Sequence, residues 1–369
     1  MPDPLPEAID LSAEAVALLA DAEHALGRLS GTTSRLVNPY LVGQPLLRRE
    51  AILSSRIEGT VTTPEQLALL EAAGDPAVPD ARIAADTREV LNYVRAMERG
   101  IELLRDLPLC LRLLRETHRV LLDGVRGGTD SPGEFRTVQN WIGQRGRPIG
   151  DARFVPPPPA DMQSALADFE RWMNAPRTGL PLLVRLAMVH YQFEVIHPFR
   201  DGNGRIGRLL LPLILIASNR LSEPVLYLSD YLERRRQAYV DHLLAVSTDG
   251  AWDDWFRFFL EGIADSAARS LSHAEELLRL HADYHGRVRS ARSSGLLAAL
   301  IDALFRVPSI TMAQTARLLE ITPAAASHNV RRLVELGILS EATGRRRNQV
   351  FVAREIIGVL GRGIGEGPT

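Results

Sequence analysis

A formal net charge of −2 over 369 residues gives this chain no overall attraction to nucleic acid or to an anionic membrane surface. Hydrophobic residues make up 46% of the sequence, enough to bury a sizeable core, and the length suits two or three domains. The sequence contains no apolar run of the ~20 residues that a membrane span needs and no signal-peptide pattern at its start. Its single cysteine, Cys110, cannot form an internal disulfide. These features predict a cytoplasmic protein without a membrane partner.

Helical periodicity marks the beginning of the chain. It covers residues 11–30 and returns over residues 45–59, where Gly59 is the expected stop. On this second helix Ser54 and Glu58 lie four residues apart and therefore share one face.

Capping residues delimit the next helices. Thr63 precedes Pro64, and Gln66 stands at the third helical position, which is the pattern of a capping box. Further helical patterns begin at Asp80 and at Pro108. The first third of the chain is therefore expected to be helical.

The period of the pattern changes between residues 135 and 155. Residues 135–143 and 153–155 have strand character and flank a turn-rich segment at 144–151. Four prolines at 156–159 end the second strand, because proline cannot donate to a strand ladder. We therefore expect one small β-hairpin here in a mainly α-helical chain.

A polar, glycine-rich stretch at 197–208 lies between two apolar helical segments, 182–191 and 209–216. Its Gly-Asn-Gly turn at 202–204 would place successive backbone N–H groups just before a helix N-terminus, an arrangement that binds phosphate. Polar sequence between buried elements marks a site more often than a simple connection.

Four side chains of this stretch carry the expected chemistry. Asp201 offers a hard oxygen ligand for Mg²⁺, and His197 can accept a proton near neutral pH. Arg205 and Arg208 are three residues apart and can reach the same anion. Taken singly, a histidine before a proline is more often structural, and two arginines at this spacing more often lie on a solvated face. Their ordered coincidence favours a site that transfers part of a nucleotide.

Helices are also expected after this stretch. Residues 227–231 are a loop or a helix start, and two amphipathic helices follow, the second of which contains Trp252 and Phe259. A polar helix over about 262–292 is expected to be a connector. His190, on the apolar helix before the polar stretch, is expected to be packed and structural.

The last region is basic: from Arg287 onward the sequence has twelve arginines and six carboxylates. Three helical segments are expected between 296 and 337, two of them capped by Thr311 and Thr322, and two short apolar segments then flank an arginine-rich tip at 344–348. Helix, helix-turn-helix and hairpin follow one another in this order in a winged helix.

The motif His-Pro-Phe-x-Asp-Gly-Asn-Gly-Arg-x-x-Arg at 197–208 resembles the signature of the Fic family at every fixed position. Residues 47–51, 154–158 and 226–229 resemble bacterial members with a C-terminal winged helix, so the likeness extends from about residue 30 onward. Fic proteins mostly transfer AMP from ATP to a hydroxyl side chain of a target protein and release pyrophosphate.

The resemblance implies a mainly α fold with a Fic helical core, a small β-hairpin flap and a C-terminal winged helix-turn-helix domain. The expected division is an N-terminal helical region at 1–105, with an inhibitory helix at about 46–59, a catalytic core at 106–285 and the winged helix-turn-helix domain at 286–369.

The resemblance also implies a role for each residue of the motif. His197 would be the general base toward a Ser, Thr or Tyr hydroxyl, and Asp201 would hold Mg²⁺ against the α- and β-phosphates of ATP. Arg208 would grip the γ-phosphate. The nucleotide-binding residues would be Gly202, Asn203, Gly204, Arg205, Ile206, Gly207 and Arg208.

Two further expectations concern substrate binding. Tyr231 and Tyr239 are weaker candidates for the adenine pocket, since either could belong to the core. The segment 140–155 resembles the family flap, which pairs with an extended segment of the target protein as an added strand.

The tetrad Ser54-x-x-x-Glu58-Gly59 resembles the inhibitory motif of the family class that carries inhibition on its own N-terminal helix. Glu58 paired with Arg208 would occupy the group that the γ-phosphate needs. The alternative is an ordinary surface carboxylate in an ion pair that contributes less than ~1 kcal/mol. In some members the same glutamate supports removal of AMP, which the sequence leaves open.

The winged helix suggests DNA as a partner. Its third helix offers Ser327, His328, Asn329, Arg331 and Arg332 toward a major groove. The tip residues Arg345, Arg346 and Arg347 would meet phosphate. Three alanines at 324–326 offer little for base reading, so dimerisation or target docking is the alternative.

Three functions are therefore compared. The first is a self-inhibited protein adenylyltransferase with ATP as co-substrate and Mg²⁺ as cofactor, which the resemblance makes a plausible homodimer. The second is a DNA-binding regulator whose core senses nucleotide. The third is the same core with another donor, such as UTP or a phosphocholine compound.

Overall fold

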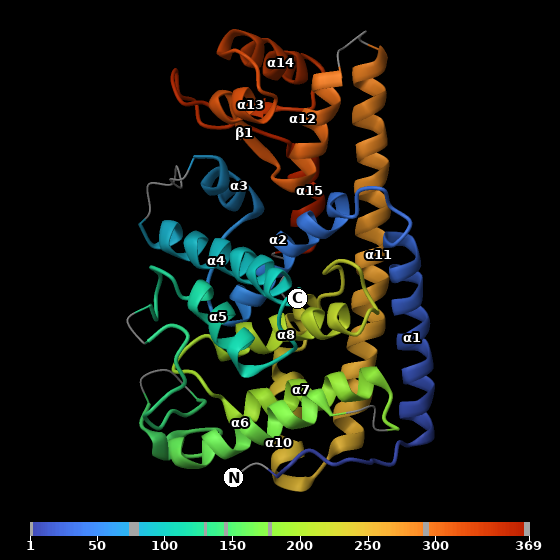
Figure 1. Cartoon of the computed structure of the whole chain (residues 1–369), viewed down its shortest axis with the longest axis vertical. Helices are drawn as coiled ribbons and strands as arrows, with labels where there is room; N and C mark the ends of the chain where they lie inside the picture. The colour runs from blue at the N-terminus through green and yellow to red at the C-terminus, as the bar shows by residue number, and fades with distance from the viewer. Residues whose placement is uncertain are drawn as a thin grey trace. The chain divides into compact units, whose positions relative to one another are not determined.

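The computed structural model describes residues 3–73, 81–128, 131–143, 147–175, 179–290 and 295–364. Over these residues the chain forms fifteen α-helices and three short β-strands, which confirms the mainly α fold (Figure 1). The chain divides into two compact units. Among the described residues, no helix combines the length and the apolar character that a membrane span requires.

The first unit comprises residues 1–30, 92–221 and 226–268. Its helices, some of which continue into the second unit, are α1 (Ala13–Thr33), α4 (Ala81–Leu103), α5 (Leu111–Leu121), α6 (Pro159–Asn174), α7 (Leu182–Ile196), α8 (Asn203–Ala217), α9 (Ser229–Arg234), α10 (Arg236–Asp249) and α11 (Trp252–Ser290).

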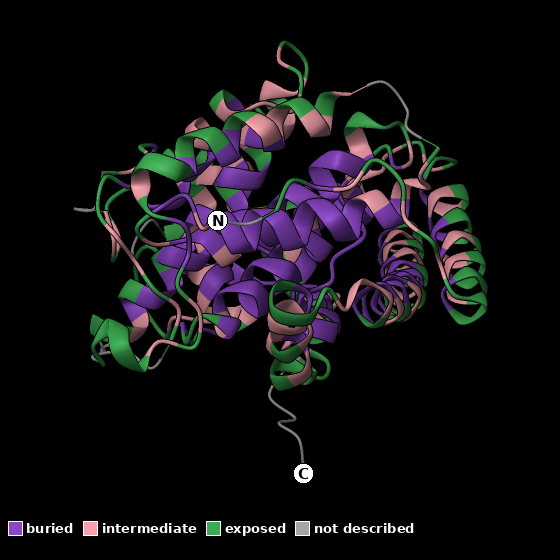
Figure 2. Cartoon of the chain, turned by 90° about the horizontal axis from the view of Figure 1, so that it is seen from below, coloured by how far each residue is buried: buried purple, intermediate pink, exposed green. Residues whose placement is uncertain are grey.

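Helices α7 and α8 form the centre of this unit. Nearly every residue of both is buried, as expected for helices that are apolar all round, and they pack against each other. Figure 2 shows such fully buried segments in purple among helices that keep one exposed side. Glycine permits close approach: a Cβ on Gly100 of α4 would lie 2.9 Å from Leu213 of α8. The polar stretch at 197–202 is therefore fixed at both ends by buried helices.

The second unit comprises residues 31–91, 222–225 and 269–369. Its elements include α2 (Tyr40–Ile57), α3 (Pro64–Ala73), α12 (Gly295–Arg306), β1 (Ser309–Thr311), α13 (Met312–Leu318), α14 (Pro323–Glu335), β2 (Ser340–Glu341), β3 (Val350–Val352) and α15 (Arg354–Gly361). The three strands pair antiparallel in the order β1-β3-β2, with Phe351 opposite both Ile310 and Glu341.

Local signals for helix ends are confirmed. Thr63 and Gln66 form a reciprocal capping box at α3, and Thr311 forms one at α13. Thr322 caps α14, and Gly59 has a φ of +88° just after α2. The expected cap at Asp80 lies outside the described residues.

Two helices extend further than their sequence patterns indicate. The structure has α2 beginning at Tyr40, with Pro45 inside the helix. The expected amphipathic helix around Trp252 and the expected connector form one helix of 39 residues, α11. Gly262 does not interrupt it, because this glycine serves packing: a Cβ there would lie 2.8 Å from the ring of Tyr231.

Two buried arginines anchor α2 within the second unit. Arg48 forms a bidentate pair with Glu71 of α3, at 2.7 and 3.0 Å. Arg49 donates to the carbonyl oxygens of Leu360 and Arg362 at the end of α15, at 2.8 and 2.6 Å. Helix α12 also packs against α2. Residues about 300 positions apart in the sequence therefore share one folded body.

We predict that Arg49→Met lowers the free energy of unfolding by about 2–4 kcal/mol, because one buried and one partly buried carbonyl group lose a charge-assisted donor. Arg354→Met is the control: this exposed arginine pairs with Glu65 in the same unit, so its loss is expected to cost less than about 1 kcal/mol. Urea unfolding measures both. Equal effects of the two substitutions would contradict the anchoring role of Arg49.

Candidate active site

His197 ends α7 in a left-handed conformation, with φ +50° and ψ +60°. Its N–H donates to Phe193 O at 3.0 Å, and Nδ1 lies 3.2 Å from Glu194 O. Since a carbonyl oxygen only accepts, Nδ1 carries the hydrogen of the neutral ring and the lone pair is on Nε2. The side chain is half-buried. The ring thus has the tautomer that a general base acting through Nε2 requires.

The backbone after His197 is held by Asn203. Phe199 N–H donates to the Asn203 side-chain oxygen at 2.8 Å, and Asn203 Nδ2 donates to Phe199 O at 2.8 Å. Asn140 donates to the same carbonyl at 3.0 Å. The Asn203 side chain is therefore committed to the loop, and only its backbone N–H is placed for an anion.

The phosphate-binding expectation rests on the start of α8. Gly202 has a φ of +78°, and the first intrahelical bond runs from Ile206 N–H to Gly202 O at 3.0 Å. The N–H groups of residues 203–205 therefore precede the helical ladder, as in other helix N-termini that bind anions.

Asp201 is the one carboxylate of the motif. Its Oδ1 accepts from Gly202 N–H at 2.5 Å and lies 3.4 Å from the Arg205 guanidinium, while the side chain stays 37% exposed. A half-exposed carboxylate next to a helix N-terminus fits the ligand that Mg²⁺ takes together with phosphate oxygens.

The two arginines at fixed positions of the motif are buried, at 1% exposure for Arg205 and 3% for Arg208. The reading of a solvated helix face is therefore wrong. Gly207 lets α8 approach α7, because a Cβ there would meet Glu194 Oε1 at 2.2 Å. Ile206 is fully buried beside them.

His118 is a residue that the sequence analysis missed. Gly133 N–H donates to its Nδ1 at 2.9 Å, which leaves Nε2–H to donate to Asp201 O at 3.0 Å. The ring stacks on Phe199 with centroids 3.7 Å apart. Burial lowers the pKa of His118 to about 4, so the ring is neutral at pH 7. Its role is to position the backbone of Asp201, the expected metal ligand.

Arg136 is a second positioning residue that was missed. Its buried guanidinium donates to His197 O at 2.9 Å and to Pro157 O at 2.5 Å, and its own N–H donates to Pro198 O at 2.9 Å. Burial lowers its pKa from the usual value. One cation thus joins the motif to the segment that follows the expected flap.

The two tyrosines considered for the adenine pocket are core residues. Tyr239 is 5% exposed, and its hydroxyl lies 2.9 Å from His190 Nε2. Tyr231 is fully buried against Phe258 and under the guanidinium of Arg235. Burial lowers the pKa of His190 to about 3, in agreement with the expected structural role of that residue.

The expected β-hairpin is reduced to one bridge, between Ile142 and Phe154. Residues 135–141 form no strand. A side chain bonds to a main-chain group that strand pairing could use, since Gln139 Nε2 donates to Pro156 O at 2.9 Å. A short 3₁₀ turn, Ile149–Asp151, lies between the bridged residues. The expected turn residues 144–146 lie outside the described residues.

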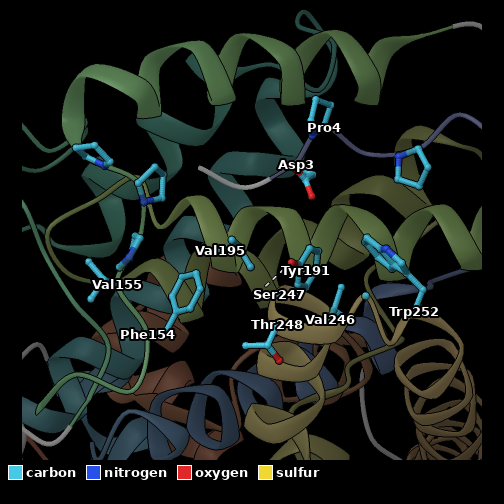
Figure 3. Close-up of a pocket in the computed structure, with 15 residues that line it drawn as sticks. Asp3, Pro4, Phe154, Val155, Tyr191, Val195, Val246, Ser247, Thr248 and Trp252 are labelled. Carbon is cyan, nitrogen blue, oxygen red and sulfur yellow. Dashed lines mark hydrogen bonds between the residues drawn. The ribbon is translucent and has the colours of Figure 1, made fainter.

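A cavity of about 580 Å³ borders this bridge (Figure 3). Phe154 and Val155 line one side, Tyr191 and Trp252 line another, and Tyr191 bonds to Ser247 at 3.0 Å. Its lining contains no residue of the 197–208 motif, so the cavity is separate from the expected phosphate-binding loop.

The residues of the expected inhibitory motif belong to the second unit. Ser54 is fully buried in α2, Glu58 is an exposed C-cap residue, and Gly59 follows in the left-handed region. The carboxylate of Glu58 thus stands at the end of a helix whose body is firmly packed.

We predict that His118→Phe destabilises the fold at pH 7 and flattens its pH dependence. The folded-state pKa of about 4 lies below the usual 6.5, so the contribution of neutral His118 is complete above pH 6.5 and is lost as pH falls to 4. This contribution is at most about 3 kcal/mol. Urea unfolding at pH 7, 6 and 5 measures it, with exposed His328→Phe as control. Parallel curves for wild type and His118→Phe would contradict the buried neutral ring.

Two sequence families match the chain. Residues 16–102 match the Fic/DOC family N-terminal region, and residues 108–215 match the Fic/DOC family. Together the two matches cover more than half of the sequence.

Named relatives agree with this assignment. The chain is 35% identical over 167 residues to "Protein adenylyltransferase Fic" of Culex quinquefasciatus, covering 44% of this chain and 28% of that protein. It is 30% identical over 221 residues to the protein of the same name from Drosophila grimshawi, covering 58% and 40%. The chain thus spans less than half the length of these relatives.

Solved structures share the fold. A Fic family protein from Desulfovibrio desulfuricans G20 matches 94% of this chain and 97% of its own, with a TM-score of 0.60 and 20% identity. A Fic domain containing signaling protein from Bacteroides thetaiotaomicron VPI-5482 matches 70% of this chain and 98% of its own, with a TM-score of 0.55 and 21% identity. With its motif, its fold and both sequence matches, the chain belongs to the Fic/DOC family.

Proposed function

We propose that this protein is an adenylyltransferase that moves AMP from ATP to a Ser, Thr or Tyr hydroxyl of a target protein, and of itself. The observation that carries the proposal is the contact of His197 Nδ1 with Glu194 O at 3.2 Å, which favours the tautomer with the lone pair on Nε2. His197 is half-buried and precedes a loop that leads directly into the N-terminus of α8.

The proposed reaction uses each part of the motif. Nε2 of His197 takes the proton of the target hydroxyl while that oxygen bonds to the α-phosphorus of ATP. The bond from the α-phosphorus to the bridging oxygen breaks, and pyrophosphate leaves. Asp201 would hold Mg²⁺, which supplies charge neutralisation on the phosphates when bound. The N–H groups of residues 203–205 and the side chains of Arg205 and Arg208 would bind the remaining phosphate oxygens.

The flap segment at 140–155 is the proposed docking edge for the target. Large apolar side chains are exposed on or beside it, at 42% for Trp141, 44% for Ile149, 47% for Val155 and 49% for Val138. An ion pair from Arg153 to Asp241 of α10 fixes the second arm. Exposed apolar residues around a strand-like bridge suit the addition of an extended peptide.

We also propose that Glu58 inhibits transfer by pairing with Arg208. The support lies in its place on α2: an exposed carboxylate at the end of a helix that Arg48 and Arg49 hold rigidly. A bidentate pair of this kind competes with the γ-phosphate for the same guanidinium.

Removing the carboxylate tests both proposals. Glu58→Gly is expected to raise self-labelling with α-labelled ATP and Mg²⁺ about 10-fold or more, since a charge-assisted pair contributes about 1.5–3 kcal/mol. Intact mass should show an AMP-sized gain, and Glu58→Gly with His197→Ala should show none. The control is Glu320→Gly, which removes an exposed carboxylate after another helix of the same unit.

Three other outcomes of this experiment would each indicate a different activity. If Glu58→Gly binds ATP with Mg²⁺ but labels neither itself nor host lysate, the nucleotide-sensing regulator replaces the transferase. If UTP, GTP or CTP labels more strongly than ATP, the donor is different. If labelled target loses AMP in the presence of wild-type protein but not of Glu58→Gly, the same glutamate also supports removal.

A second function is favoured by the C-terminal elements, which we propose form a winged helix that binds DNA. Helix α12, strand β1 and helices α13 and α14 are followed by β2 and β3, which complete a sheet of order β1-β3-β2. The exposed residues Arg345, Arg346 and Arg347 lie between β2 and β3. Arg331 is exposed on α14, and Arg332 pairs with Glu335 at 2.8 Å. Ser327 and His328 are at least partly exposed on the same helix.

One expected DNA contact is corrected. Asn329 is 8% exposed, and its amide donates to Ala325 O at 2.8 Å within α14. Its side chain therefore belongs to the packed side of the helix and does not read bases.

Neutralising the tip tests this second function. Arg345, Arg346 and Arg347 together changed to Ser should weaken DNA binding and make the slope of log K against log salt shallower by about 0.9 for each lost phosphate contact. The matched control removes three exposed or half-exposed arginines of the first unit, Arg99, Arg105 and Arg171. Equal DNA binding by both triple variants would favour a role in dimerisation or target docking, which the oligomeric state of the two variants distinguishes.

A further inference from the structure

Two histidines and an aspartate converge on one point of the second unit. His281 and His285 are four residues apart on α11 and share one face, and Asp302 faces them from α12. The distance from His281 Nε2 to Asp302 Oδ1 is 2.6 Å, from His285 Nε2 to the same oxygen 3.1 Å, and between the two Nε2 atoms 3.1 Å.

From this geometry we propose that His281, His285 and Asp302 bind a divalent transition-metal ion such as Zn²⁺. A tetrahedral ion bound at about 2.0–2.1 Å separates its ligand atoms by about 3.3 Å, close to two of the three observed distances. Two imidazole nitrogens and one carboxylate oxygen are donors that Zn²⁺, Co²⁺ and Ni²⁺ prefer, whereas Mg²⁺ and Ca²⁺ prefer oxygen.

The backbone under this triad is fixed before any ion binds. Leu277 and Tyr284 of α11 lie in one buried apolar cluster with Ile301 and Phe305 of α12. Phe305 also contacts the His281 ring edge-on, with centroids 5.1 Å apart. A packed seam on both sides of the triad keeps the three ligand atoms within reach of one ion, which lowers the conformational cost of binding.

The triad also leaves room for a fourth ligand. The side chains of His281, His285 and Asp302 are 21%, 24% and 30% exposed. Three protein ligands at a solvent-accessible edge leave one tetrahedral position for water. The bound ion would join α11 to α12 next to the start of α2, where the guanidinium of Arg306 lies 5.3 Å from the Tyr40 ring.

The competing explanation is a hydrogen-bonded cluster in which both imidazoles donate to Asp302 and no ion binds. The two explanations differ in whether Nε2 of each histidine carries a hydrogen or a lone pair. In the cluster each Nε2 carries a hydrogen, whereas in a metal site each Nε2 presents a lone pair and Nδ1 carries the hydrogen. Binding of a metal ion therefore separates them directly.

The test uses the full-length protein without a polyhistidine tag, stripped of metal and titrated with CoCl₂. We expect visible absorption bands of tetrahedral Co²⁺ that saturate at one ion per chain and disappear when Zn²⁺ is added. His281→Ala and His285→Ala should each lower the affinity for Co²⁺ by more than about 100-fold. Loss of a residue that only hydrogen-bonds to a metal ligand typically lowers metal affinity by about 10–100-fold.

Controls separate this site from other ligands and from misfolding. His273→Ala removes a half-buried histidine from the same helix and should leave the bands unchanged. Asp201→Asn should also leave the bands unchanged, since that carboxylate belongs to the 197–208 motif and is not one of the three proposed ligands. Zn²⁺ should raise the thermal midpoint of wild type and of His273→Ala, but not of His285→Ala, and circular dichroism checks that each variant is folded. Absence of the bands in wild type, or bands that persist in His281→Ala, would overturn the proposal in favour of the hydrogen-bonded cluster.

Discussion

A single buried guanidinium, that of Arg136, joins the start of the 197–208 motif to the segment that follows the Ile142–Phe154 bridge. Arg136 donates to the carbonyl oxygens of His197 and Pro157, from chain segments on either side of α6, and its backbone N–H binds Pro198 O. Burying a cation costs free energy unless its N–H groups are hydrogen-bonded. These carbonyl groups must therefore lie close enough to Arg136 to accept from it. The same hydrogen bond stabilises the left-handed turn at His197, because the carbonyl oxygen of His197 is one of the acceptors.

Three histidines around the motif differ in environment and therefore in role. His190 and His118 are buried, and the loss of solvation lowers their pKa values to about 3 and about 4. Each is a neutral hydrogen-bonding group that fixes backbone or packing. His197 alone of the three is half-buried at the mouth of the loop. Burial thus keeps the imidazoles of His190 and His118 neutral at pH 7.

Much of this could be predicted from the sequence, because its signals are local. Helix caps at Thr63, Thr311 and Thr322 were identified from side chains next to the backbone groups they satisfy. The motif at 197–208 was identified because its residues are adjacent in the chain. His118 and Arg136 could not be found in this way, since their partners in the motif lie about 60 to 80 residues away and no periodic pattern marks them. The hairpin was predicted too long because the pattern does not show that side chains such as Gln139 satisfy the main-chain groups that strand pairing would use.

The second unit gives the proposed inhibition a physical setting. Helix α2, which carries Glu58 at its end, is held by Glu71 of α3 and by the terminal carbonyl groups of α15 through Arg48 and Arg49. A ligand of α12–α15 therefore acts on a body that includes α2, the proposed inhibitory helix. Such a ligand changes inhibition only by the difference in its affinity for the inhibited and the active state, whatever its total affinity. A metal ion between α11 and α12 that leaves α2 in one position would thus stabilise the unit without regulating it. Regulation requires that the Arg49 bonds to α15, or the packing of α12 on α2, differ between the two states.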